Sequence, residues 1–112
     1  MQWTVEDLPN GVARLNLAGR IDVQGALAVD PVFEDLARKQ SKLVVDMSDV
    51  TFLASLGIRT LVSCCKALAD KGGELVLLAP QPGVEKVLKT SGISTIIPIV
   101  SQMSEAEALL HK

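Results

Sequence analysis

Hydrophobic residues in this chain follow two spacings in turn, one typical of strands and one typical of helices. Near the start, Trp3 to Leu8 and Val12 to Leu17 are short runs of alternating character, and Pro9-Asn10-Gly11 between them supplies turn residues. These runs predict a β-hairpin. The stretch from Gly19 to Asp22 is then expected to be a loop that leads to the first helix.

The first helix is predicted to run from Pro31 to about Lys39. Proline fits the first position of a helix, and Asp30 would then be the N-cap. Apolar residues repeat behind it at helical spacing, at Phe33, Leu36 and Ala37. The segment before Asp30 is ambiguous, and Ala26 to Val29 could form a preceding helical turn.

Two apolar stretches predict strands that are covered on both faces. These are Leu43 to Met47, which is interrupted only by Asp46, and Glu74 to Leu78. Asp46 is expected to be structural, because the sequence offers no second catalytic group at a recognisable spacing. Ser48 and Asp49 are expected to shape a turn after the first of these strands.

The segment between the two strands predicts a helix from Ile58 to Ala69, which follows Ser55 and is ended by Gly72-Gly73. Its apolar residues repeat at helical spacing, at Ile58, Leu61, Val62, Cys65 and Leu68. A third helix is predicted from Pro82 to Ser91, with Gly92 at its end and with Val84, Val87 and Leu88 facing inward.

The last part of the chain predicts one strand and one helix. Thr95 to Val100 is a short strand that Pro98 confines to a sheet edge. Ser104 and Glu107 form a capping box for a helix that continues through Leu110. The full order alternates strands and helices after the hairpin, so residues 1–112 are predicted to form one α/β domain with a mainly parallel sheet and about four helices.

Composition narrows the possible functions. Hydrophobic residues make up 48% of the chain and charged residues 21%, which is typical of a packed globular domain. The net charge is −2 and basic residues are not clustered, so nucleic acid is not expected as a partner. No apolar run is long enough to cross a bilayer, and the start of the chain, with Glu6 and Asp7, lacks the pattern of a secretory leader. We therefore expect a cytoplasmic protein without direct membrane insertion.

Candidate chemistry is sparse. Cys64 and Cys65 are adjacent on a predicted helix and are expected to be reduced thiols that face the core. A metal site would need further ligands, and the sole histidine is His111. The chain shows no phosphate-binding glycine loop and no nucleophile–base pair, so we expect no catalytic residue, cofactor or metal.

Ser55 is the most informative position. It follows a buried strand and an acidic stretch, and it lies at the mouth of an apolar helix. A helix N-terminus presents free amides and the positive end of the dipole, which favours a phosphate. Ser55 is thus a candidate phosphorylation switch. A plain N-cap role is the alternative, and the two roles are compatible.

Three stretches resemble a STAS domain of the bacterial anti-sigma factor antagonist kind. They are Leu17-Ala18-Gly19-Arg20-Ile21-Asp22, the segment from Val44 to Gly57, and Gly72 to Leu77 followed by Val84 to Gly92. The resemblance implies a protein that sequesters an anti-sigma factor, which is often also a serine kinase. That kinase would phosphorylate Ser55 and so release itself, and a serine phosphatase would reset the cycle.

Two positions depart from the family pattern. Ala54 stands where the family commonly has Asp before the acceptor, and Leu56 stands where it has Ser or Thr after it. The expected partner-binding face comprises Asp22, Ala54, Ser55, Leu56, Gly57 and Arg59. Arg59 is either a solvated surface cation or a contact for a partner carboxylate or a phosphate on Ser55. Asp22 is either part of this face or a loop cap.

The family also allows a second function without a phosphorylation switch. Single STAS domains serve as accessory subunits of membrane transport systems of the lipid-transport type, and the changes at Ala54 and Leu56 favour that alternative. A small-molecule binder or enzyme is a third class, for which the sequence carries no motif.

Overall fold

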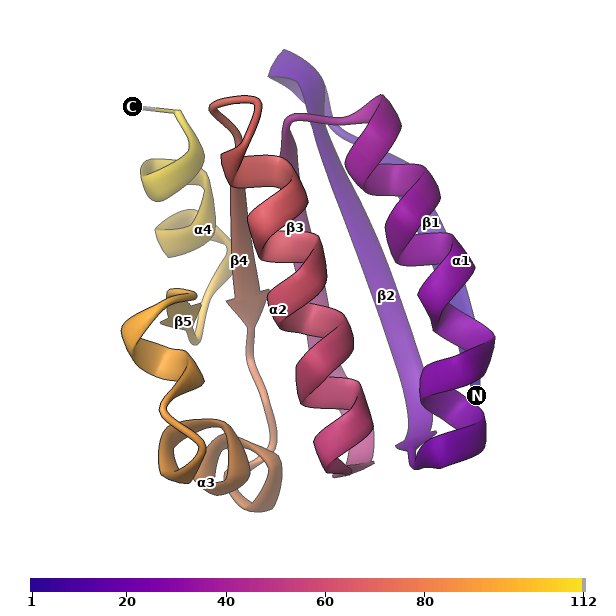
Figure 1. The fold of residues 1–112 in the computed structure, drawn as a ribbon. Helices are drawn as coiled ribbons and strands as arrows, with labels where there is room; N and C mark the ends of the chain where they lie inside the picture. The colour runs from indigo at the N-terminus through magenta and orange to yellow at the C-terminus, as the bar shows by residue number, and fades with distance from the viewer. Residues whose placement is uncertain (112) are drawn as a thin grey trace.

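Five strands form one sheet in the order β1-β2-β3-β4-β5, as the computed structural model of residues 1–111 shows (Figure 1). β1 and β2 are antiparallel, and every later pair is parallel. The strands are β1 (Gln2–Asp7), β2 (Val12–Ile21), β3 (Lys42–Leu53), β4 (Glu74–Leu78) and β5 (Ile99–Val100). The helices are α1 (Val23–Lys39), α2 (Ser55–Ala69), α3 (Pro82–Thr90) and α4 (Met103–Leu110), with short 3-10 turns η1 (Pro9–Gly11) and η2 (Ile93–Thr95).

The predicted α/β class, the mainly parallel sheet, the hairpin and the four helices are confirmed. Two apolar clusters hold the layers together. The larger one joins one face of the sheet, through residues such as Leu15 and Val45, to α1, α2 and α3. The smaller one joins the other face, through Val44 and Val76, to α4. Because neighbouring strand residues point to opposite faces, β3 contributes to both clusters, as its continuous apolar run predicted.

The expected loop at residues 19–22 is wrong, because β2 continues through Ile21. Gly19, Arg20 and Ile21 pair in parallel with β3. Ile21 is buried, so this part of the strand is stabilised by core contacts as well as by its pairing with β3. The loop between β2 and α1 is therefore reduced to Asp22.

The predicted start of the first helix is also wrong. α1 begins at Val23, Asp22 is its N-cap, and Pro31 lies inside the helix. An internal proline removes one hydrogen bond and crowds the preceding turn. Burial of Ala26 and Val29 before it, and of Phe33 after it, keeps the helix continuous across the proline.

β3 does not end in a turn at Ser48 and Asp49, as the sequence predicted. Both residues lie within the strand, and the register with β2 shifts twice, between Asn16 and Ala18 and again between Gly19 and Arg20. These β-bulges absorb extra β3 residues without breaking the strand. Their effect is to carry the chain in one long strand to the start of α2.

The C-terminal elements differ from the prediction in their bounds. β5 contains only Ile99 and Val100, and residues 93–95 form the 3-10 turn η2. Val87 of α3 is 37% exposed, so its predicted inward orientation is wrong. The capping box of α4 is formed by Gln102 and Glu105, since the helix begins earlier than Ser104.

The Asp22 cap gives a first testable prediction. Its Oδ1 accepts a 2.8 Å hydrogen bond from the backbone N–H of Gly25. Replacing Asp22 by Ala is expected to lower the free energy of unfolding by about 1 kcal/mol, because that amide loses its acceptor. Urea denaturation measures the change. Asp22→Asn keeps an acceptor and is the matched control; equal losses in both variants would contradict the cap.

Candidate functional site

The candidate site lies at the edge of the sheet where β2 and β3 end and where α1 and α2 begin (Figure 1). The N–H of Ala54 donates a 2.8 Å hydrogen bond to the carbonyl of Ile21. This bond ties the two chain segments together, one residue before Asp22 and one before Ser55. Asp22 and Ser55, which are far apart in sequence, therefore belong to the same surface.

Ser55 is the first residue of α2 and is exposed. Ala54 occupies the N-cap position without a side-chain hydrogen bond, and its carbonyl accepts from Gly57 (2.9 Å) and Ile58 (3.2 Å). The N-cap interpretation of Ser55 is therefore wrong. Within residues 1–111 its hydroxyl makes no hydrogen bond, so it is available to solvent.

Gly57 lies buried below Ser55, in the first turn of α2. A Cβ there would come within 2.6 Å of Ile21 Cγ2 and 2.7 Å of Leu53 Cδ1. Its role is to let the start of α2 approach the ends of β2 and β3 closely. Gly57 was predicted to lie on the partner-binding face, but its neighbours cover it. It determines how close the start of α2 lies to the sheet.

Charged groups surround this edge. Arg59 is exposed and forms no ion pair within the described residues. Asp22 is engaged as the cap of α1, and its Oδ2 lies 4.0 Å from Nε of Arg20. The Arg20 guanidinium lies 4.5 Å from the centroid of the Phe52 ring, a cation–π contact that the sequence did not predict.

Two exposed apolar residues extend the surface. Val23 and Leu27, one turn apart on α1, are 58% and 61% exposed. Further along α1, Asp30 Oδ1 accepts a 2.8 Å hydrogen bond from the hydroxyl of Thr60 on α2. α1 and α2 start at the same end of the sheet and run in the same direction (Figure 1). Leu27 precedes Asp30 by three residues, so it lies on the same side of α1 as Asp30, the side that faces α2.

We name this surface the α1–α2 edge. It comprises Asp22, Val23, Leu27, Ala54, Ser55, Leu56 and Arg59. Sequence reasoning missed Val23 and Leu27 because it started the helix eight residues too late. With the helix start placed at Val23, the i, i+4 spacing of these two residues would have indicated that they lie on the same side of the helix.

On its other side, Ser55 lines a shallow groove between α2 and α3. Ile58 contributes from α2, and Lys86, Val87 and Thr90 contribute from α3. Val87 is the exposed valine of α3, so the groove has an apolar wall. Lys86 adds a positive charge to the surroundings of Ser55.

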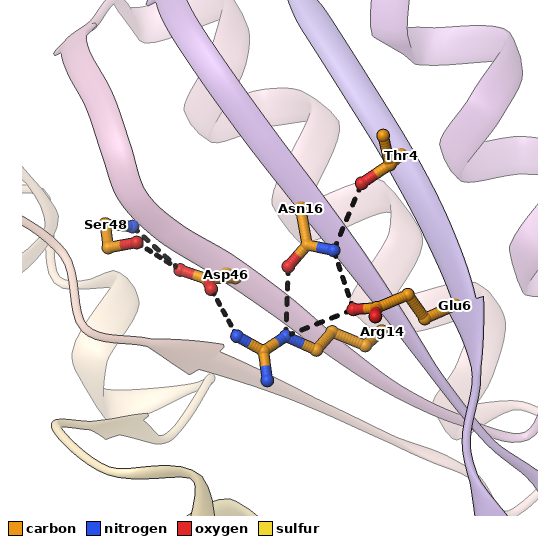
Figure 2. A network of polar contacts seen from close by, with 6 residues as sticks. All are labelled: Thr4, Glu6, Arg14, Asn16, Asp46 and Ser48. Atoms are coloured by element: carbon orange, nitrogen blue, oxygen red, sulfur yellow. Dashed lines mark hydrogen bonds and ion pairs between the residues drawn. The ribbon is translucent and has the colours of Figure 1, made fainter.

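Asp46 lies away from this edge, in a polar network on the sheet face that carries α4 (Figure 2). Its Oδ2 lies 2.6 Å from Nη2 of Arg14, and its Oδ1 accepts from the N–H (2.9 Å) and hydroxyl (2.8 Å) of Ser48. Arg14 also donates to Asn16 (2.9 Å), which donates to Glu6 (2.9 Å). These contacts occupy the carboxylate and agree with a structural role.

The network makes folding depend on pH. Burial by itself would raise the pKa of Asp46, but the hydrogen bonds from Ser48 and the Arg14 guanidinium hold it below the ordinary value. A lowered pKa stabilises the fold above the unfolded-state pKa of about 4, and this contribution is lost as pH falls through the folded-state value. We expect Asp46→Asn to cost about 2 kcal/mol near pH 7 and progressively less as the pH falls through the folded-state pKa.

Urea denaturation at neutral pH and at a series of acidic pH values measures how the cost changes. Asp49→Asn is the matched control, because Asp49 is exposed on the same strand and forms no ion pair in the described part of the chain. A loss in Asp46→Asn that does not vary with pH would contradict the assignment.

The cysteines are free thiols, as expected. Burial raises the pKa of Cys64 to about 12, and burial also raises the pKa of Cys65. Neither is therefore a reactive thiolate at neutral pH. Across residues 1–111 no cluster of three potential metal ligands was found, and no helix there is both long and apolar enough to span a membrane.

The fold agrees with the family comparison. The chain belongs to the STAS domain family, whose model matches residues 7–106. It is 28% identical to BtrV of Bordetella bronchiseptica over 98 residues, which are 88% of this chain and 78% of BtrV. It is 27% identical to the anti-sigma F factor antagonist of Paenibacillus polymyxa over 105 residues, which are 88% of this chain and 90% of that protein.

Solved structures show the same fold. An anti-sigma factor antagonist from Mycobacterium paratuberculosis is 25% identical, with a TM-score of 0.88 over 99% of this chain and 94% of that one. SpoIIAA, an anti-sigma factor antagonist known in an unphosphorylated and a phosphorylated form, has TM-scores of 0.83 and 0.74. At 16% and 15% identity, SpoIIAA supports the fold alone.

Proposed function

We propose that this protein is an anti-sigma factor antagonist that binds an anti-sigma factor through the α1–α2 edge. The observation that carries the proposal is the exposed, unbonded hydroxyl of Ser55, which precedes the half-buried Leu56 and lies at the same end of the sheet as the exposed Leu27. Exposed apolar groups next to a modifiable hydroxyl give a surface that a partner covers and that a phosphate alters. The antagonist names of the relatives supply the class of partner.

The same geometry supports a phosphorylation switch on Ser55. The anti-sigma factor is proposed to be a serine kinase that phosphorylates Ser55 in the cytoplasm, and a serine phosphatase restores the free hydroxyl. This protein acts by binding and contributes no catalytic group of its own. Lys86 lines the same groove as Ser55, and Arg59 follows Ser55 by one helical turn, so both can contact the phosphate.

The transport alternative keeps the fold and removes the switch. The relatives compared above carry the antagonist name, and Ser55 retains an accessible hydroxyl despite the changes at Ala54 and Leu56. These two points favour the antagonist function. Recovery of a transporter subunit in place of a kinase would reverse this preference.

The experiment uses the purified full chain and each anti-sigma factor kinase of the same genome. We expect one kinase to bind the unmodified chain in calorimetry and, with ATP and Mg²⁺, to add one phosphate that mass spectrometry places on Ser55. Ser55→Ala is expected to bind that kinase and to stay unmodified. The proposal fails if none of the kinases binds the unmodified chain.

The apolar part of the edge gives a separate prediction. Leu27→Asp is expected to weaken binding of the anti-sigma factor by roughly 10-fold or more, because a charge replaces an exposed apolar residue of the α1–α2 edge. Ile96→Asp is the matched control, since Ile96 is 58% exposed and follows η2, away from this surface. Calorimetry with both variants distinguishes a local effect from a general one, and equal affinities would remove Leu27 from the interface.

A further inference from the structure

The outer edge of β1 has no neighbouring strand, and it is longer than the other free edge of the sheet. All six residues of β1 are exposed, whereas the opposite edge of the sheet is the two-residue β5, which follows Pro98. β1 pairs with β2 without a bulge and contains neither proline nor lysine. Natural sheets usually interrupt or charge such an edge to prevent pairing. This edge has only the acidic residues Glu6 and Asp7 at one end.

Backbone geometry fixes which residues of β1 point outward. The N–H of Leu8 donates to the carbonyl of Val12 (2.8 Å), which extends the β1–β2 ladder by one pair. Hydrogen-bonded and non-hydrogen-bonded pairs alternate along an antiparallel ladder. Because Leu8 belongs to a hydrogen-bonded pair, the backbone N–H and C=O groups of the even-numbered residues of β1 point toward β2. The backbone groups of Trp3 and Val5 consequently face outward and have no strand beside them.

We propose that the β1 edge pairs with β1 of a second copy of this chain, antiparallel, about a two-fold axis at Thr4. In this register Trp3 lies opposite Val5 of the second copy, and Val5 lies opposite its Trp3. Both are residues whose backbone groups point outward, so the pairs exchange hydrogen bonds. The two sheets become one continuous ten-stranded sheet.

Side chains select this register over its neighbours. Trp3 and Val5 are 39% and 46% exposed and lie on the face that carries α1, since they pair with Leu17 and Leu15. With the axis at Thr4, the two apolar residues of each copy meet on that face. An axis at Val5 would instead place Trp3 opposite Asp7, and an axis at Trp3 would leave Glu6 and Asp7 without partners.

Charge is compatible with the pairing. Gln2 lies opposite Glu6 in this register, so no two carboxylates face each other. Glu6 is also held by Asn16 (2.9 Å) and lies 3.8 Å from Nε of Arg14 within its own chain (Figure 2). Two six-residue strands bury a small area, so the dimer is expected to be weak and to form at high protein concentration.

The pairing does not depend on the proposed function. Ser55 opens α2 and follows β3, which is separated from the β1 edge by β2. The dimer therefore leaves Ser55 uncovered. A failure of anti-sigma factor binding would not affect this inference, and a monomeric chain would not affect the proposed function.

Sedimentation velocity of the full chain from about 10 µM to about 1 mM tests the association. We expect a concentration-dependent dimer, together with a blue shift in the fluorescence of Trp3, the sole tryptophan of the chain. Val5→Lys is expected to abolish the dimer, whereas Val87→Lys, at an exposed valine on α3, leaves it intact. A chain that stays monomeric at the highest concentration overturns the proposal.

Single cysteines test the register, in a background with Cys64→Ala and Cys65→Ala. Thr4→Cys places two thiols across the axis at a non-hydrogen-bonded pair, where Cα atoms lie about 4.5 Å apart and a disulfide fits. Gln2→Cys and Glu6→Cys place them roughly 13 Å apart, beyond its reach. Cross-linking of Thr4→Cys alone supports the register. Equal cross-linking of all three variants, or none, overturns it.

Discussion

A phosphate on Ser55 is expected to lower the affinity of this protein for its anti-sigma factor by about 100-fold. The group adds about −1.5 to −2 charges near neutral pH. Ser55 lies next to the half-buried Leu56 and on the same edge as the exposed Leu27. A partner that packs on these apolar residues must also remove water from the phosphate, and that desolvation opposes binding.

Calorimetry with the kinase-modified and unmodified chains measures the loss. Ser55→Asp is expected to reproduce part of it, because it carries one negative charge in place of nearly two. Ser104→Asp is the matched control: Ser104 is exposed in the first turn of α4, on the other side of the sheet. Unchanged affinity in both the phosphoprotein and Ser55→Asp would show that the partner binds elsewhere.

The affinity should fall without loss of the fold. Ser55 is the first residue of α2, and a negative group there is stabilised by about 0.3–1 kcal/mol through the helix dipole. The phosphorylated chain is therefore expected to unfold at the same urea concentration as the unmodified chain, or slightly above it. The switch changes the charge of the surface and leaves the structure below it in place.

The spacing of apolar residues was sufficient to locate elements that have a clear buried face, such as β4 and α3. β4 was predicted with its observed bounds, and α3 to within one residue. Both have a clear apolar pattern with turn residues at their ends. The position of Ser55 at the start of α2 was predicted for the same reason, since the apolar repeat from Ile58 onward leaves little choice.

Errors arose where tertiary contacts outweighed a local signal. Pro31 is a strong helix-start signal, yet the buried residues on both sides of it keep α1 continuous. Ser48 and Asp49 are turn formers, yet pairing with β2 holds them in a bulged strand. The first of these errors also affected the site, because Val23 lies before the predicted helix and Leu27 lies in the segment that the sequence left ambiguous.

Close backbone contacts are another feature that periodicity does not reveal, and they lead to the last prediction. At Gly25 a Cβ would lie 2.3 Å from the carbonyl oxygen of Arg20. Backbone cannot move aside as a side chain can, so Gly25→Ala is expected to displace the start of α1 and to lower the free energy of unfolding by about 3 kcal/mol. The Asp22 cap would be lost with it, since the amide of Gly25 is its donor.

Two other glycines set the scale for this loss. The atoms that crowd Gly57 are the side-chain ends of Ile21 and Leu53, which can shift, so Gly57→Ala is expected to cost about 1 kcal/mol. Gly83 of α3 has open space around it and no positive φ, so Gly83→Ala should stabilise the helix by up to about 1 kcal/mol. We expect the urea midpoint to decrease in the order Gly83→Ala, wild type, Gly57→Ala, Gly25→Ala. That order would establish that the close approach of backbone segments, and not the flexibility of glycine, positions the α1–α2 edge. Equal midpoints for Gly25→Ala and Gly57→Ala would contradict it.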